Sequence, residues 1–145
     1  MTQEEKELLL KDLCARLPYR VKVYNTTFKE PTIQTLYGKI SNDEFSMEET
    51  YTSVGVDGDD FGFFNKRHYT GYVDFIKPYL RPMSSMTEEE EILFRCELPV
   101  IAKTDAQLVT MRMELFLKGN LDFNHLIEKG LAIEAPEGMY NLKER

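Results

Sequence analysis

The chain has 145 residues, a length that suits one domain built around one hydrophobic core. Hydrophobic residues make up 42% of it, which is typical of a folded protein and too rich for a disordered one. The formal net charge of -7 opposes non-specific attraction to nucleic acid or anionic lipid, because neutralising phosphates requires clustered Lys and Arg. The composition therefore favours a partner with a basic surface.

The N-terminal region begins with acids at Glu4 and Glu5, where a secretory signal requires positive charge followed by an apolar run. No apolar stretch approaches the roughly 20 residues of a membrane-spanning helix. Cys14 and Cys96 lie in segments with helical spacing, so we expect buried thiols and no disulfide. These features predict a cytoplasmic protein with no membrane association.

The first elements follow from a change in hydrophobic period. Thr2 and Glu5 form a capping box, which predicts a helix that ends near Pro18. From Tyr19 to Asn25 apolar and polar residues alternate, which is typical of a half-buried strand.

Several strand segments follow, joined by tight turns. Alternation or β-branched and aromatic residues predict strands over Thr32–Ile40, Tyr51–Val56, Phe61–Phe64 and Thr70–Ile76. Gly38 indicates either a bulge or a close approach of another backbone in the first of these segments. Four or five short antiparallel strands predict a meander that forms either a curved sheet or a small SH3-like barrel.

The C-terminal half is predicted to be mainly helical. Capping boxes open two amphipathic helices, one that stops before Pro99 and one that stops at Gly119. A short helix over Asp122–Lys129 and a last strand over Leu131–Ile133 complete the pattern. We therefore predict one α+β domain over residues 1–145, in which a helix and strand-rich half, 1–82, packs against a helical half, 83–145.

Three stretches of the sequence resemble a known group of proteins. They are EKELLLKDLCARLPY at 5–19, KPYLRPMSSMTEEE at 77–90 and LIEKGLAIEAP at 126–136. They are similar to small proteins of phages and prophage-like elements of gut bacteria, a group with no assigned activity. The resemblance implies an accessory protein that modulates a host or phage machine by binding to it, and it implies no chemistry.

Candidate chemical groups have more ordinary explanations in the sequence. The acids Asp57, Asp59 and Asp60 offer oxygen ligands to a divalent cation, but the calcium-loop spacing is missing and a solvated hairpin turn accounts for them. His68 could act as a general base, yet no motif pairs it with a nucleophile, and His125 has no zinc-type partner spacing. We therefore predict no catalytic residue, no metal site and no cofactor.

Two binding surfaces are compatible with the pattern. The amphipathic helices of the C-terminal half could present a groove to a protein partner, although core packing explains the same apolar stripe. Alternatively, strand residues could combine cations with stacking rings, as proteins that bind single-stranded nucleic acid do. The candidate binding residues of that face are Arg20, Lys22, Tyr24, Tyr37, Lys39 and Tyr72.

The leading functional hypothesis is non-enzymatic binding of a protein partner, since the chain is acidic and catalytic motifs are missing. The alternative is a small β-barrel that binds nucleic acid or a nucleotide through the basic and aromatic face. An enzyme is the third hypothesis. The sequence leaves the partner and the oligomeric state open.

Overall fold

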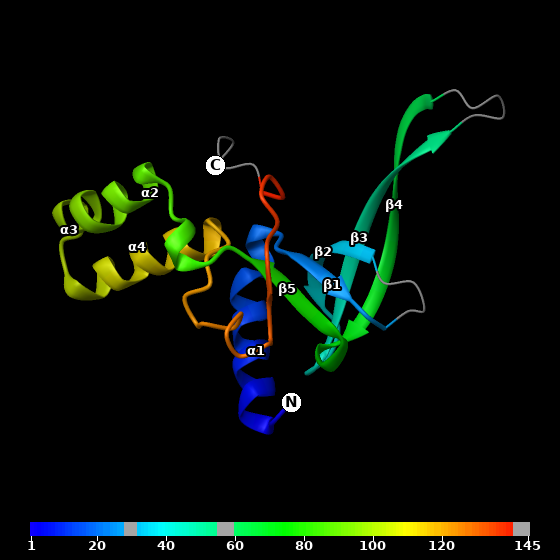
Figure 1. The fold of residues 1–145 in the computed structure, drawn as a ribbon, viewed down its shortest axis with the longest axis horizontal. Helices are drawn as coiled ribbons and strands as arrows, with labels where there is room; N and C mark the ends of the chain where they lie inside the picture. The colour runs from blue at the N-terminus through cyan, green and yellow to red at the C-terminus, as the bar shows by residue number, and fades with distance from the viewer. Residues whose placement is uncertain (28–31, 55–59, 141–145) are drawn as a thin grey trace. The chain divides into compact units, whose positions relative to one another are not determined.

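The computed structural model describes residues 1–27, 32–54 and 60–140 (Figure 1). The chain forms two compact units, Met1–Lys77 and Pro78–Arg145, which we call the N-terminal and C-terminal units. The first holds a helix and antiparallel strands, and the second is mainly helical, so the predicted α+β class is confirmed. That the two halves of the chain form one domain stays a prediction.

The N-terminal unit contains helix α1, two 3₁₀ turns and four complete strands. In chain order these are α1 (Gln3–Arg16), η1 (Leu17–Tyr19), β1 (Lys22–Asn25), β2 (Thr32–Lys39), β3 (Glu44–Val54), β4 (Asp60–Tyr72) and η2 (Val73–Phe75). Strand β5 (Ile76–Leu80) begins in this unit. The C-terminal unit continues with η3 (Met83–Ser85), α2 (Glu88–Ile92), the π-helix η4 (Leu93–Glu97), α3 (Leu98–Ile101), α4 (Asp105–Lys118) and β6 (Ile133–Glu134).

Helix α1 begins and ends where the sequence predicts. The Thr2 hydroxyl accepts the Glu5 N–H at 3.1 Å, and the Glu5 carboxylate accepts the Thr2 N–H at 3.0 Å, which completes the capping box. Leu9 and Leu13, one turn apart, are fully buried. The helix ends before Pro18, which sits at the start of the 3₁₀ turn η1.

The first strand starts later than its alternation predicts. Because η1 extends to Tyr19 and Arg20 adopts a left-handed conformation (φ 55°), the extended backbone begins only at Lys22. The predicted alternation itself is confirmed, since Val21 and Val23 are fully buried.

The strands of the N-terminal unit pair in the order β4-β3-β2-β1, all antiparallel. The register between β2 and β3 shifts between Leu36 and Gly38, which confirms a bulge at this place. Figure 1 shows β3 and β4 extending together beyond β1 and β2. The sheet is open, so the curved-sheet alternative describes it and the closed barrel does not.

Strand β4 differs from its prediction. The two short strands expected at Phe61–Phe64 and Thr70–Ile76 are parts of one strand that runs from Asp60 to Tyr72. The pairing with β3 continues along its length, and the 3₁₀ turn η2 separates it from β5. Local propensity predicted a gap there, but the hydrogen-bonded ladder with β3 bridges it.

The core of the N-terminal unit lies on one face of the sheet. Leu36, Phe45 and Met47 are fully buried, and residues that lie opposite one another across β2 and β3 share a face. Lys6 links helix α1 to the turn between β2 and β3, because its ammonium lies 3.4 Å from the Asp43 carboxylate.

In the C-terminal unit the strands β5 and β6, which come from the start and the end of the unit, form a short parallel pair. Tyr79 lies opposite Ile133 in the pairing of β5 with β6, and the Tyr140 hydroxyl donates to the Tyr79 carbonyl at 2.7 Å. The helix predicted over Asp122–Lys129 is wrong. The Asp122 carboxylate accepts the backbone N–H of Leu126 and of Ile127, and His125 has φ 57°, so the segment closes as a series of turns.

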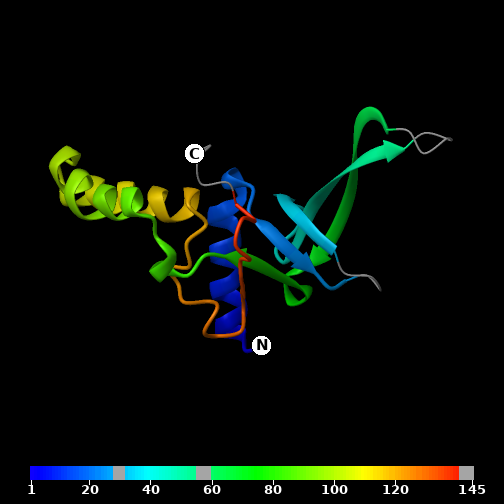
Figure 2. The ribbon, with the colours of Figure 1, turned by 45° about the horizontal axis from the view of Figure 1, so that its top comes forward.

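The helix predicted to stop before Pro99 instead continues to Ile101. Proline lacks an N–H, and its ring clashes with the carbonyl four residues earlier in an α-helix. Here the preceding turn widens into the π-helix Leu93–Glu97, which is closed by the Leu98 N–H bonded to the Leu93 carbonyl. The wider turn accommodates Pro99, and α4 then runs back alongside α2 and α3 (Figure 2).

We expect Asp12→Ala to destabilise the N-terminal unit by about 3 kcal/mol or more, because it removes one partner of a buried ion pair. The Asp12 carboxylate lies 2.7 Å from Arg16 Nε, and both side chains are fully buried. Urea denaturation of the full chain measures this loss. Lys11→Ala, at an exposed position of α1, is the control and should change the free energy of unfolding by less than about 0.5 kcal/mol.

Candidate functional site

The sheet of the N-terminal unit brings several of the predicted binding residues to its outer face. Lys22 lies opposite Thr35, and Thr35 lies opposite Glu48. Directly opposite residues of an antiparallel pair point to the same side. Tyr24, two residues after Lys22, therefore shares this face, which is the one opposite the core.

Three further predicted residues lie on or beside the same face. Tyr72 lies opposite Glu44, which is four residues before Glu48 along β3 and so points the same way. The guanidinium of Arg20 lies 4.7 Å from the centre of the Tyr37 ring, a cation–π contact beside the bulge of β2. Five of the six candidate residues thus lie on or beside one face of the sheet.

Lys39 does not join this face. The bulge between Leu36 and Gly38 changes the alternation, and Lys39 lies opposite the buried Phe45. Residues opposite one another share a side of the sheet, so Lys39 belongs to the core side and is exposed at the end of β2.

Among the side chains that the structure describes, the outer face carries acids as well as bases. Glu44 and Glu48 accompany Arg20 and Lys22, and the Glu48 carboxylate lies 3.8 Å from the ring of the exposed His68. A groove that follows a phosphate backbone requires an excess of positive charge. The geometry therefore gives the nucleic-acid hypothesis little support.

The other candidate chemical groups do not form a site. Asp57 and Asp59 lie outside the described residues. His68 and His125 are both exposed. In residues 1–27, 32–54 and 60–140, no three His, Cys, Asp or Glu side chains are grouped so that they could hold a metal ion. Both cysteines are free; Cys14 is half-buried, and Cys96 is exposed, so its expected burial is wrong.

The helices of the C-terminal unit leave several apolar residues exposed. Within residues 88–118, all of which the structure describes, Leu98 is the single buried residue. The exposed fraction is 83% for Val100, 55% for Ile101, 60% for Val109 and 45% for Ile92. Core packing therefore does not account for the whole apolar stripe, and the sequence analysis missed Val100 and Ile101 as surface residues.

An aromatic row holds these helices together. The ring of Phe94 lies 5.3 Å from that of Phe116, which in turn lies 5.7 Å from that of Phe123. The guanidinium of Arg112 lies 5.0 Å from the centre of the Phe94 ring. Such contacts contribute roughly 0.5–1.5 kcal/mol each beyond the burial of their area. They join η4 to α4 and leave the remaining apolar side chains at the surface.

Arg81 fixes the end of the helical segment at which α2 begins. Its guanidinium donates to both oxygens of Glu90, at 2.7 and 3.2 Å, and to the carbonyls of Ser85 and Gly119, at 2.9 and 3.0 Å. The Glu90 carboxylate also accepts the Thr87 N–H. Partial burial acts to raise the pKa of Glu90, but the hydrogen bonds from Arg81 and Thr87 outweigh it and hold the pKa below its usual value.

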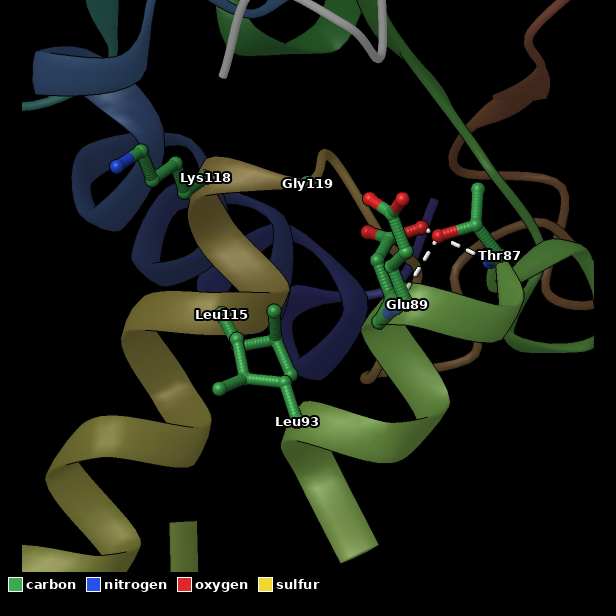
Figure 3. Close-up of a pocket in the computed structure, with 7 residues that line it drawn as sticks. Thr87, Glu89, Leu93, Leu115, Lys118 and Gly119 are labelled. Atoms are coloured by element: carbon green, nitrogen blue, oxygen red, sulfur yellow. Dashed lines mark hydrogen bonds between the residues drawn. The ribbon is translucent and has the colours of Figure 1, made fainter. Parts of the chain in front are cut away.

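A pocket of about 220 Å³ lies beside this ion pair, between the start of α2 and the end of α4 (Figure 3). Figure 3 shows Leu93 and Leu115 next to each other on its apolar side, while Lys118 extends away from Glu89. The volume is below the roughly 300–1,000 Å³ of sites for small organic ligands. The residues that line the pocket are Thr87, Glu89, Glu90, Leu93, Leu115, Lys118 and Gly119.

In comparisons with known protein families, with curated proteins and with solved structures, the chain matches no family model, no curated protein and no solved structure. None of the helices in the described part of the chain has the length and apolar character that crossing a lipid bilayer requires.

We expect Glu90→Gln to lower the free energy of unfolding by about 2 kcal/mol at pH 7, because Arg81 loses its charged partner. The folded-state pKa of Glu90 is lowered, so its contribution is complete above the unfolded-state pKa of about 4.3 and declines as the pH falls through the lower folded-state value. Urea denaturation of both proteins between pH 7 and pH 3 should show the difference shrinking toward acid pH. The exposed neighbour Glu91→Gln should show no such difference; an equal effect would contradict the assignment.

Proposed function

We propose that the protein acts by non-enzymatic binding of another protein, and that the helices α2, α3 and α4 supply the binding surface. The observation that carries the proposal is the exposure of Val100, Ile101 and Val109 on helices that hold one buried residue, Leu98. Val100 and Ile101 lie on α3 and Val109 lies on α4. Exposed apolar side chains on neighbouring helices are typical of protein–protein interaction surfaces.

The physical reason is an incomplete core. Helices are stable in a domain when their apolar stripe is covered by a second layer. Burying one Val or Ile side chain completely contributes roughly 1.5–3 kcal/mol, so covering several half-exposed ones is worth several kcal/mol. A partner that supplies the missing layer would gain this free energy on binding, less the cost of ordering both surfaces.

The resemblance of three stretches to phage and prophage proteins supports the same class of function. Under this proposal the partner is a protein of the bacterial host or of the phage itself, met in the host cytoplasm. The -7 net charge favours a partner with a basic surface.

Affinity capture from host lysate with matched variants tests the proposal. Val109→Glu and Thr110→Glu place one acid at neighbouring exposed positions of α4, and only the first removes an apolar side chain. We expect a stoichiometric partner to be retained by the wild type and by Thr110→Glu, and lost with Val109→Glu and with Val100→Glu.

Circular dichroism and thermal unfolding should show that all three variants fold, since each position is exposed. Retention of the same proteins by every variant would contradict the assignment of this surface. Retention of no protein by the wild type would contradict the proposed function.

A further inference from the structure

We infer that the partner's binding segment is a basic amphipathic helix, and that the pocket beside Leu93 and Leu115 takes one of its Lys or Arg side chains. This inference rests on the proposed function and names the chemistry of the partner.

The size and lining of the pocket fit one long side chain. Its volume of about 220 Å³ is too small for most organic ligands and comparable to a single large residue. Leu93 and Leu115 provide an apolar wall, as Figure 3 shows, and Glu89 provides a carboxylate. Lys and Arg combine an apolar stem with a charged head, so they match a wall and a carboxylate at the same time.

The two carboxylates of the pocket differ in their availability. Both oxygens of Glu90 accept hydrogen bonds from Arg81, and one also accepts the Thr87 N–H. The Glu89 side chain is exposed and its carboxylate makes no hydrogen bond or ion pair to any residue that the structure describes, while its backbone carbonyl accepts the Leu93 N–H within the helix. Lys118 lines the pocket but extends away from Glu89 in Figure 3. Glu89 is therefore the carboxylate of the pocket that remains available to a cation.

The helical segment around the pocket has a net negative charge. Residues 88–118 hold seven acidic and four basic residues. A second copy of the chain would bring another net charge of -7 to this surface, which opposes self-association. A basic segment instead gains from the charge and from the exposed apolar residues Val100, Ile101 and Val109. An amphipathic helix presents both in one element, which is a recurring mode of recognition.

Three synthetic peptides of the same length test the inference. Each carries Leu on one helical face, and the other face carries Lys, acetylated Lys or Glu. Fluorescence anisotropy measures their affinity for the wild-type chain and for Glu89→Gln, Glu88→Gln and Val109→Glu. Glu88 is the matched control, because it is exposed on the same helix and does not line the pocket.

We expect the Lys peptide to bind the wild type most tightly and the Glu peptide most weakly. Glu89→Gln should weaken the Lys peptide five- to tenfold and Glu88→Gln less than twofold. The acetylated peptide should bind the wild type and Glu89→Gln equally, because it keeps the apolar stem without the charge. Val109→Glu should weaken the Lys and acetylated peptides.

The outcomes separate the two proposals. Equal binding of the Lys and Glu peptides, or equal effects of Glu89→Gln and Glu88→Gln, would overturn the inference of a basic helix that uses the pocket. If Val109→Glu still abolished binding in that case, the proposed apolar binding surface would remain supported. Failure of the Lys peptide to bind, or its indifference to Val109→Glu, overturns both. A dimer in sedimentation that Val100→Glu dissociates would assign the surface to a second copy and overturn the basic partner.

Discussion

The buried guanidinium of Arg81 is the constraint on which the C-terminal unit depends. The Arg81 backbone N–H donates to the Asn120 carbonyl, and the Arg81 carbonyl accepts the Asp122 N–H. These two hydrogen bonds hold the Arg81 backbone in place independently of its side chain. The side chain, 8% exposed, then joins Glu90 at the start of α2 to Gly119 at the end of α4. An arginine cannot lose its charge on burial, so these acceptors must stay in place. Both ends of the helical segment are thereby held at one point.

That anchor explains how helices with so few buried residues keep their positions. The ion pair fixes them at one end, and the contact between Phe94 and Phe116 joins η4 to α4. Helices that are held by an ion pair and by aromatic contacts need less buried aliphatic surface than helices that are held by an aliphatic core alone. Val100 and Val109 are therefore left outside it, on a surface whose backbone is already ordered. A preorganised surface loses less conformational entropy when a partner covers it.

Features that depend on neighbouring residues were predictable from the sequence, and features that depend on distant ones were not. The capping residues Thr2 and Thr87 gave correct helix starts, because a cap is made within one turn. The side of Lys39 could not be predicted, since it depends on where the ladder with β3 shifts register. Pro99 indicated a helix end from its local chemistry, yet a π-turn accommodates it. Arg81 looked like one more cation in an extended segment, because its acceptors come from residues 85 to 119.

The same limit applies to the candidate surfaces. Alternation correctly placed Lys22 and Tyr24 on one face, but the sequence did not show that the acids Glu44 and Glu48 belong to the same face, because that depends on the pairing of β3 with β2 and β4. Conversely, an apolar stripe along a helix does not reveal whether another layer covers it, and here Val109 stays exposed. Charge then decides what such an exposed stripe can do. Under the proposed function, acids beside apolar side chains would repel further copies of an acidic chain and attract cations, which would make the surface selective for a basic partner.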